Sequence, residues 1–215
     1  MITFWTAAPT ALAAAYLLGA IPTAYLAGRL FQGLDIREHG SGSVGATNTL
    51  RVLGKWPALA VLLVDVLKGT AAVVLARWLV GPAALAPAPT MDAQTLAPWV
   101  VAMAGLAALL GHSRSIWLKF TGGKSVATGL GVLLAISWPA AIGALACFGV
   151  VVAIFRIVSL GSVVAAVVAV ALMFGLGQPL AFQLLIAAGG LYVVVRHRAN
   201  VGRLLAGTEP RLGSR

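Results

Sequence analysis

Acidic residues are scarce in this chain of 215 residues, in which five Asp and Glu stand against 15 Lys and Arg. Two of the five, Asp35 and Glu38, fall in one connection, so the sequence argues against a carboxylate-bound Mg²⁺ site. We therefore expect no metal and no other cofactor. The formal net charge of +10 could indicate a nucleic-acid partner. However, the basic residues border apolar stretches rather than forming a separate polar domain, and we expect no nucleic acid.

Cysteine is nearly absent as well, since Cys147 is the only one in the chain. This excludes a disulfide within the chain and a site built from several thiolates. Cys147 lies in an apolar stretch with no histidine near it in the sequence. We interpret it as a packing residue rather than a nucleophile.

The chain is rich in long apolar stretches. Hydrophobic residues make up 60% of it, charged residues 9%, and the mean hydropathy is +1.00. These values predict a polytopic membrane protein. The stretches are rich in Ala, Leu and Val without alternation over ten residues, so we predict an all-α fold rather than a barrel. No segment outside them could build a second core, and residues 1–215 are expected to form a single domain.

Seven stretches are predicted to span the membrane, the third and fourth of them short. They are residues 4–28, 57–79, 96–111, 125–137, 139–155, 159–176 and 178–195. Of the 15 Lys and Arg, 13 lie in alternate connections: 29–55, 112–124, 156–158 and the tail. The other connections, 80–95, 138 and 177, carry none. This asymmetry predicts the amino terminus outside, the tail in the cytoplasm, and re-entrant or interfacial loops on the cytoplasmic side.

The first polar cluster is Gly40-Ser41-Gly42-Ser43-Val44-Gly45-Ala46-Thr47-Asn48. Its glycines allow backbone amides to converge on an anion, and its hydroxyl and amide side chains add donors. The segment 50–53 is predicted to form a short interfacial helix. Within it, Arg51 offers a fork that can hold a phosphate by two hydrogen bonds. The alternative is a flexible loop in which Thr47 or Asn48 caps the helix.

The second cluster closes with Gly122-Gly123-Lys124 and opens the next helix. A Gly-Gly turn at the start of a helix suits an anion, and Lys124 supplies a point charge. Trp117 and Phe120 are typical of a chain lying at the membrane interface, where they could line a slot for an acyl tail. An ordinary interfacial loop is the alternative.

The third cluster follows the last apolar stretch, where His197, Asn200 and Leu204 have the spacing of one helical face. Arg196 and Arg198 are explained by the positive-inside rule, whereas the pair His197 and Asn200 is not. In the second apolar stretch, Asp65 and Lys68 stand three residues apart at membrane depth. Such groups are functional candidates, and they can also neutralise each other as a structural ion pair.

Together these motifs resemble the acyl-phosphate:glycerol-3-phosphate acyltransferases of bacteria, the PlsY family. The resemblance rests on Gly40-Ser41-Gly42-x-x-Gly45-Ala46-Thr47-Asn48 with Arg51, on Gly111-His112 with Lys119-Phe120-x-Gly122-Gly123-Lys124-x-Val126-Ala127-Thr128, and on His197-x-x-Asn200-x-x-Arg203-Leu204-Leu205 with Gly207-Thr208-Glu209. It covers essentially the whole chain. The family often has an aromatic residue in place of Arg114, and commonly has Pro in place of Ser115 and Gly in place of Ser125, so the middle loop could be shaped differently here.

The resemblance implies an enzyme of the bacterial plasma (inner) membrane that carries out the first committed step of phospholipid synthesis on the cytoplasmic side. The 1-hydroxyl of glycerol 3-phosphate would attack an acyl phosphate, giving lysophosphatidic acid and phosphate. The acyl phosphate would come from a peripheral enzyme in transient contact, and membrane lipids would surround the site. An acyl phosphate already carries a good leaving group, so positioning and charge stabilisation can supply most of the catalysis.

The expected functional residues fall in all three clusters. The catalytic residues are expected to be His197, Asn200, Ser41, Arg51 and Lys124. The substrate-binding residues are expected to be Gly42, Gly45, Thr47, Asn48, His112, Gly122, Gly123, Arg203 and Glu209. Two roles stay open for His197, a general base or a hydrogen-bonding orienter while a substrate phosphate takes the proton.

A transporter for a phosphorylated small anion is the main alternative. It would use the same basic, glycine-rich clusters, but it needs sites near the membrane midplane and access from both faces. All three clusters are predicted at one face, which favours an enzyme. A docking protein without catalysis would not account for His197 with Asn200 or for the Gly-Gly-Lys turn.

Overall fold

The computed structural model describes residues 3–82 and 91–213, and the described residues are helical apart from turns, loops and one isolated antiparallel bridge between Ser115 and Thr121. This confirms the all-α membrane class. Residues 83–90 of the predicted outer connection 80–95 lie outside the described residues. Contacts divide the chain into two compact units, residues 1–135 and 136–215.

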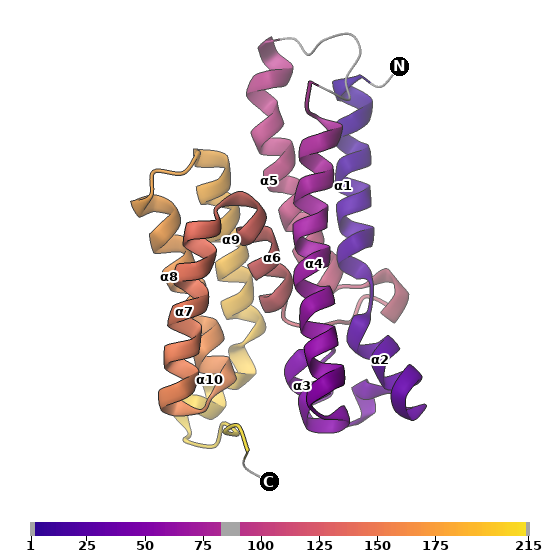
Figure 1. Cartoon of the computed structure of the whole chain (residues 1–215), viewed down its shortest axis with the longest axis vertical. Helices are drawn as coiled ribbons and strands as arrows, with labels where there is room; N and C mark the ends of the chain where they lie inside the picture. Colours follow the sequence, from indigo (N-terminus) through magenta and orange to yellow (C-terminus); the bar gives the residue numbers. More distant parts are fainter. Residues whose placement is uncertain (1–2, 83–90, 214–215) are drawn as a thin grey trace. The chain divides into compact units, whose positions relative to one another are not determined.

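The first unit is built on three long helical segments that lie side by side in Figure 1. They are α1 (Phe4–Ala20) with its continuation α2 (Thr23–Gln32), α4 (Lys55–Leu79) and α5 (Met91–Ser113). Shorter elements complete the unit: η1 (Ile36–Glu38), α3 (Ala46–Leu53), η2 (Ile116–Leu118) and α6 (Val126–Ile136), whose last residue belongs to the second unit.

Small residues let these helices approach closely. Along α1, buried Ala7, Ala11, Ala15 and Gly19 recur every four residues, and a Cβ added to Gly19 would collide with the backbone of Ala108 in α5. Between α4 and α6, a Cβ on Gly69 would likewise meet the backbone of Thr128, and one on Gly131 that of Val66. Helices in lipid pack through small residues that allow close backbone approach, because the hydrophobic effect does not drive their association there.

The second unit contains α7 (Trp138–Phe155), α8 (Val158–Gly175), α9 (Leu180–Arg196) and α10 (Arg198–Leu205), with α8 packed between α7 and α9. The tail returns to this unit, because Leu212 and Arg156 exchange two hydrogen bonds, N–H to O at 2.6 Å and guanidinium to O at 2.7 Å.

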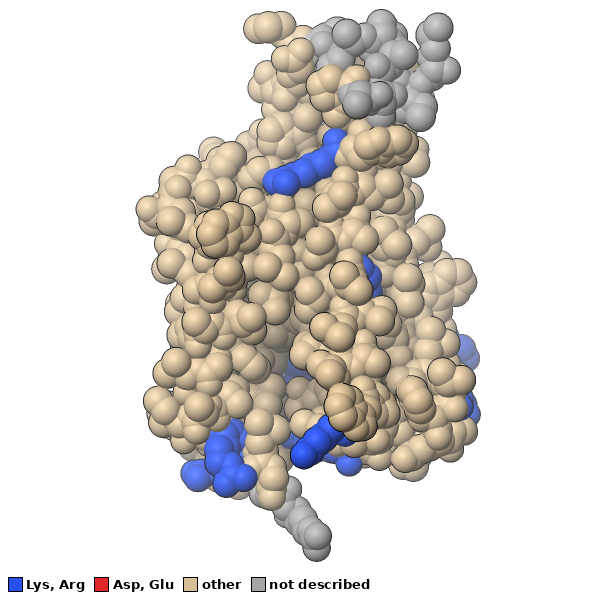
Figure 2. Space-filling view, in the orientation of Figure 1, with Lys and Arg blue, Asp and Glu red and all other residues tan. Residues whose placement is uncertain are grey.

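Most of the large side chains on the helices face outward and are apolar. The face in Figure 2 shows few Lys and Arg on a predominantly uncharged surface, and exposed residues include Leu67 (63%) and Ile154 (68%). In the first unit, tryptophans are exposed near both ends: Trp5 and Trp78 at one end, Trp56 and Trp117 at the end with the loops. An apolar band with aromatic residues at its ends is the surface expected in a bilayer.

In the described residues, five helical segments are long and apolar enough to cross a membrane: Phe4–Gln32, α4, α5, α7 and α8. The pair α9 and α10, bent by 58°, would be a sixth, and α6 is apolar but only 11 residues long. At 1.5 Å per residue, α6 covers roughly 16 Å, about half the hydrocarbon thickness. The predicted count of seven spans, their orientation and the single domain stay predictions.

The first predicted stretch is confirmed as a candidate span but contains a break, and the predicted start of the third stretch was wrong. The stretch 4–28 is interrupted at Ile21 and Pro22, because proline lacks an N–H and disfavours helical geometry in the residue before it. The third stretch is not short, since α5 has 23 residues and begins at Met91, before Pro98. Residues 91–96 include Asp92 in the first turn, where a carboxylate favours the helix dipole.

Candidate active site

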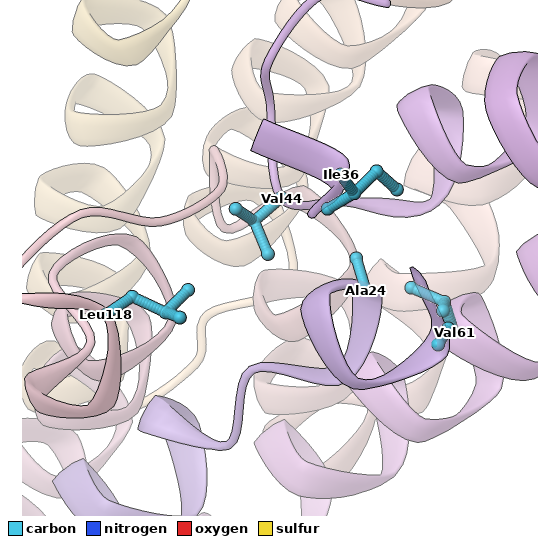
Figure 3. Packing of buried hydrophobic residues seen from close by; sticks show 6 residues of the cluster. Ala24, Ile36, Val44, Val61 and Leu118 are labelled. Atoms are coloured by element: carbon cyan, nitrogen blue, oxygen red, sulfur yellow. The ribbon is translucent and has the colours of Figure 1, made fainter. Parts of the chain in front are cut away.

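A small apolar core at the loop end of the first unit holds the two glycine-rich loops in place. Figure 3 shows Ala24 of α2, Ile36 of η1, Val61 of α4, and Val44 and Leu118 from the two loops converging on it. Ile36 is fully buried, and Val44 and Leu118 are 5% and 4% exposed. The polar loops are therefore packed on the helices, which corrects the alternative of a flexible first loop.

Asn48 organises the first loop from inside it. Its side-chain oxygen accepts from the N–H of Ser41 at 2.8 Å, and its amide nitrogen donates to the carbonyls of Ile36 (3.2 Å) and His39 (3.0 Å). Gly40 and Gly42 have φ values of 61° and 68°, a left-handed geometry that favours glycine. The loop is thus shaped by glycines at two turns and by one buried amide.

The predicted interfacial helix begins earlier than expected. α3 starts at Ala46 with Gly45 as its N-cap residue, so Thr47 and Asn48 lie inside the first turn and neither caps the helix. The capping interpretation was wrong because the Asn48 side chain turns back to the preceding loop instead of to its own helix. Ser41 and Arg51 are exposed, and Thr47 is half-buried.

Asp35 and Arg37 form a tight pair in the same connection that the sequence analysis did not assign. The Arg37 guanidinium donates from Nε at 3.0 Å and from Nη2 at 2.6 Å to the two Asp35 oxygens. The hydrogen bond from the Arg37 side chain, with that from its backbone N–H and the charges of Arg37 and Arg29, holds the pKa of Asp35 at about 2. A spacing of two residues in a loop gives no periodic signal that could have predicted the pair.

The second loop folds back on the end of α5. The N–H of Gly123 donates to the carbonyl of His112 at 3.2 Å, and Ser115 and Thr121 are bridged. A Cβ on Gly122 would collide with the His112 carbonyl, and one on Gly123 with the His112 ring and the Val44 carbonyl. Gly122 and Gly123 are therefore needed for close approach between backbones.

Two departures from the family pattern have a structural explanation. Ser115 donates its hydroxyl to the carbonyl of Ala20 at 2.6 Å and its N–H to Thr121 at 3.2 Å, bonds that proline could not make. Ser125 has a φ of 62°, in the region where glycine is favoured, and donates its buried hydroxyl to the carbonyl of Leu109 at 2.7 Å. The third departure, Arg114, places its Nη1 3.4 Å from the carbonyl of Phe120.

The structure brings the first and second clusters together in the first unit. Val44 of the first loop touches the Gly123 position of the second, and a cavity of about 380 Å³ opens between them, lined by Asp35, Arg37, Glu38, Gly42, Val44, Thr121 and Gly122. Arg51 and Lys124 are not part of that lining. Two carboxylates against one guanidinium give the cavity the wrong balance for a phosphate, so we do not assign a phosphate to it.

The predicted ion pair at membrane depth is present. Lys68 Nζ lies 2.7 Å from Asp65 Oδ1, with side chains 3% and 1% exposed. Lys68 also donates to the carbonyl of Ile21 at 2.9 Å, and Thr23 donates its hydroxyl to Asp65. Neither partner on the α1–α2 break was anticipated, because nothing in the sequence signals a contact across more than forty residues.

In the second unit, the third cluster forms a hydrogen-bonded network. The carboxylate of Glu209 accepts from Asn200 Nδ2 (2.6 Å), Ser159 Oγ (2.7 Å) and Arg203 Nε (2.7 Å). Burial raises the pKa of Glu209, but these three hydrogen bonds outweigh it and leave the pKa below its usual value. Glu209 thus fixes the orientation of the Asn200 amide.

His197 lies at the junction of α9 and α10 and is 3% exposed. Its Nδ1 is 2.7 Å from the carbonyl of Val193, and since a carbonyl only accepts, Nδ1 carries the proton. Nε2 is then the basic nitrogen. The predicted helical face of His197, Asn200 and Leu204 was only partly right, because the 58° bend makes His197 the residue between the helices.

Known proteins match nearly the whole length of the chain. The sequence profile of the family "Glycerol-3-phosphate acyltransferase" matches residues 10–207. A relative called Glycerol-3-phosphate acyltransferase 2 from Rhizobium johnstonii is 62% identical over 98% of each chain. Glycerol-3-phosphate acyltransferase from Acaryochloris marina is 58% identical over 94% of this chain and 90% of the relative.

Two solved structures share the fold. A crystal structure of PlsY (YgiH), an integral membrane glycerol 3-phosphate acyltransferase, in the glycerol 3-phosphate form, superposes with a TM-score of 0.84 at 35% identity, covering 96% of each chain. The lysophosphatidic acid form gives 0.82 at 34% identity, over 96% of this chain and 95% of the other. On the evidence of sequence and fold together, the chain belongs to the glycerol-3-phosphate acyltransferase family.

Proposed function

We propose that this chain transfers a fatty acyl group from an acyl phosphate to the 1-hydroxyl of glycerol 3-phosphate. The hydroxyl oxygen forms a bond to the carbonyl carbon, and the bond from that carbon to the phosphate oxygen breaks. The products are lysophosphatidic acid and inorganic phosphate, and the hydroxyl proton passes to a base or to a phosphate oxygen. Membership of the family supports the acyl transfer, and the solved relatives in glycerol 3-phosphate and lysophosphatidic acid forms support the acceptor and the product.

The observation that carries the proposal is the packing of two glycine-rich loops against each other in the first unit. Ser41 and Lys124 lie in these loops and Arg51 lies in α3 after the first loop; these three residues are proposed to hold phosphate and developing oxyanion charge. Both substrates carry phosphate, so more than one anion-binding loop is required. Fixed donors around a good leaving group can supply the positioning and charge stabilisation that such a reaction needs.

His197 and Asn200 are proposed to handle the attacking hydroxyl. With the proton on Nδ1, Nε2 of His197 can accept either a hydrogen bond or the proton itself. We favour the orienting role, because a good leaving group requires little base strength. His197→Gln keeps hydrogen-bonding capacity without a base. Retention of a substantial fraction of turnover supports the orienter, whereas a loss as deep as that of His197→Ala makes His197 the base.

The remaining substrate contacts are proposals from the family motifs. They are Gly42, Gly45, Thr47, Asn48, His112, Gly122, Gly123, Arg203 and Glu209. Of these residues, Asn48 and Glu209 are proposed to act indirectly, by shaping the site rather than by touching the substrate, because they form hydrogen bonds with other protein groups. Placement of the site on the cytoplasmic side of a bacterial inner membrane, and supply by a peripheral enzyme that makes acyl phosphate, rest on the family resemblance and the distribution of basic residues.

The test uses the full chain purified in detergent with labelled glycerol 3-phosphate and a chemically made acyl phosphate. We expect labelled lysophosphatidic acid, unchanged by a chelator, and no product when acyl-CoA or acyl carrier protein replaces the acyl phosphate. Product from acyl-CoA alone would overturn the donor. Absence of any product, with uptake of glycerol 3-phosphate by vesicles containing the protein, would favour a transporter.

A further inference from the structure

Helix packing alone does not explain the buried ion pair of Asp65 and Lys68. Taking two charges out of water is costly, and a pair of apolar residues of similar size often serves a buried interface as well or better. Both side chains are almost fully buried on α4, and they bind the break between α1 and α2 through Thr23 and Ile21. Ionisable groups at such depth call for a functional explanation.

The His112 side chain, which lies beside Asp65, has a polar atom without a hydrogen bond. The Nδ1 atom of His112, on a side chain that is 6% exposed, lies 3.6 Å from Asp65 Oδ1, and it is buried without a hydrogen-bond partner. A distance of 3.6 Å is too long for a hydrogen bond. Buried polar atoms left without a partner are uncommon and call for an explanation.

The opposite edge of the imidazole faces Gly123 of the second loop. A Cβ added to Gly123 would strike Nε2 of His112, and the backbone carbonyl of His112 accepts from the N–H of Gly123. The His112 ring therefore packs closely against the backbone of the Gly122–Gly123 turn. The carboxylate of Asp65 thus lies at one edge of the ring and the turn lies at the other.

We propose that Asp65 is a positioning residue that acts through His112 on the Gly122–Gly123–Lys124 turn. When glycerol 3-phosphate or acyl phosphate occupies the site, the gap between His112 Nδ1–H and the Asp65 carboxylate closes to a hydrogen bond. Hydrogen bonds of this kind are often long without substrate and tighten in the complex. Lys68 pairs with Asp65 and ties it to the α1–α2 break.

This inference rests on the proposed function, since it assigns Asp65 a part in the same site. Asp65→Asn alone leaves the Lys68 charge buried and unpaired, which can prevent folding. The variant to use is therefore the neutral pair Asp65→Asn/Lys68→Met. We expect it to fold and to lower kcat/KM by roughly 10- to 100-fold, the scale of a displaced positioning group.

A double-mutant cycle separates positioning through His112 from general stability. In a His112→Asn background, the same Asp65→Asn/Lys68→Met change should lower kcat/KM by no more than about threefold, because the connection is already cut. Equal effects in the two backgrounds would overturn the proposal. Thr70→Val is the matched control: it removes the hydroxyl bond from α4 to the Gly131 carbonyl (3.0 Å) and should leave KM unchanged.

A second readout does not depend on turnover. The chain has three histidines, and the ¹⁵N resonances of His112 can be assigned by their loss in His112→Asn. With glycerol 3-phosphate added, His112 should carry its proton on Nδ1, and the neutral pair variant should lose this preference. Protonation on Nε2 alone in the parent protein would exclude the bond to Asp65. If the parent shows no turnover, the proposed function fails and this measurement decides the inference by itself.

Discussion

The side-chain oxygen of Asn48 accepts a 2.8 Å hydrogen bond from the backbone N–H of Ser41, seven residues earlier. The same amide donates to the carbonyls of Ile36 and His39, so one buried side chain satisfies three backbone groups between Ile36 and Ser41. A buried backbone group that loses its partner costs roughly 1–3 kcal/mol. Asn48 is therefore the residue on which the shape of the first loop depends.

Asn48→Ala should destabilise the protein by about 2–4 kcal/mol and raise KM more than it lowers kcat, because the loop loses its shape while the reacting groups stay. Asn48→Asp should be at least as harmful, since it directs a carboxylate oxygen at two carbonyls. Thermal unfolding in detergent and steady-state kinetics measure both effects. Thr49→Val, which removes one hydroxyl bond to Gly45 in the same helix, is the control and should cost less than about 1.5 kcal/mol.

Ser125 should distinguish backbone strain from hydrogen bonding. Ser125→Gly relieves a left-handed residue by about 1–2 kcal/mol and loses a hydroxyl bond of similar value, so stability should change little. Ser125→Ala keeps the strained backbone and loses the bond, and should unfold at a lower temperature than the glycine variant. An alanine variant as stable as the glycine variant would contradict the left-handed geometry.

Asp35 should give the protein a pH-dependent stability. Its folded pKa of about 2 lies below the ordinary 3.8, so the stabilisation is complete above pH 4 and is lost as the pH falls from about 4 to 2. The difference in unfolding temperature between the parent and Asp35→Asn should be largest at pH 6 and shrink by pH 3. A difference that is constant from pH 6 to pH 2.5 would show that the carboxylate is not paired with Arg37 in solution.

Arg51→Lys should lower kcat/KM by about 30- to 1000-fold, corresponding to roughly 2–4 kcal/mol of transition-state binding, because a point charge cannot reproduce a fork of two hydrogen bonds. Lys124→Ala should have an effect of the same order. Lys55→Ala removes an exposed charge from the same connection as Arg51 and should stay within about threefold. Full activity in the Arg51 and Lys124 variants would reduce both loops to membrane-anchoring segments.

The three clusters should all react from the cytoplasm. Single cysteines at Ser43, Thr121 and Ala199 in a Cys147→Ser background should resist an impermeant thiol reagent in intact cells and react once the membrane is opened. A cysteine at Met91, exposed at the start of α5, should react from outside and serves as the control. Labelling of any of the three cluster positions in intact cells would rule out the predicted orientation.

Much of the class and chemistry was accessible from the sequence, because those depend on local composition. Long apolar stretches require helices in lipid, and the scarcity of polar residues makes the three clusters conspicuous. The pairing of Asp65 with Lys68 followed from their spacing on one helix. By contrast, the contacts of Asp65 with Thr23 and of Glu209 with Ser159 join segments far apart in the sequence, so spacing along the chain could not predict them.

The sequence by itself determined that this is an all-helical membrane protein with three glycine- or cation-rich clusters suited to phosphate. The tertiary structure decided which of those residues contact other parts of the protein. Asn48 bonds to its own loop, Glu209 orients Asn200, and His112 lies between Asp65 and Gly123. The physical reason is that helix formation depends on residues near in the sequence. A tertiary hydrogen bond or a close glycine contact needs a partner that folding brings from a distant segment.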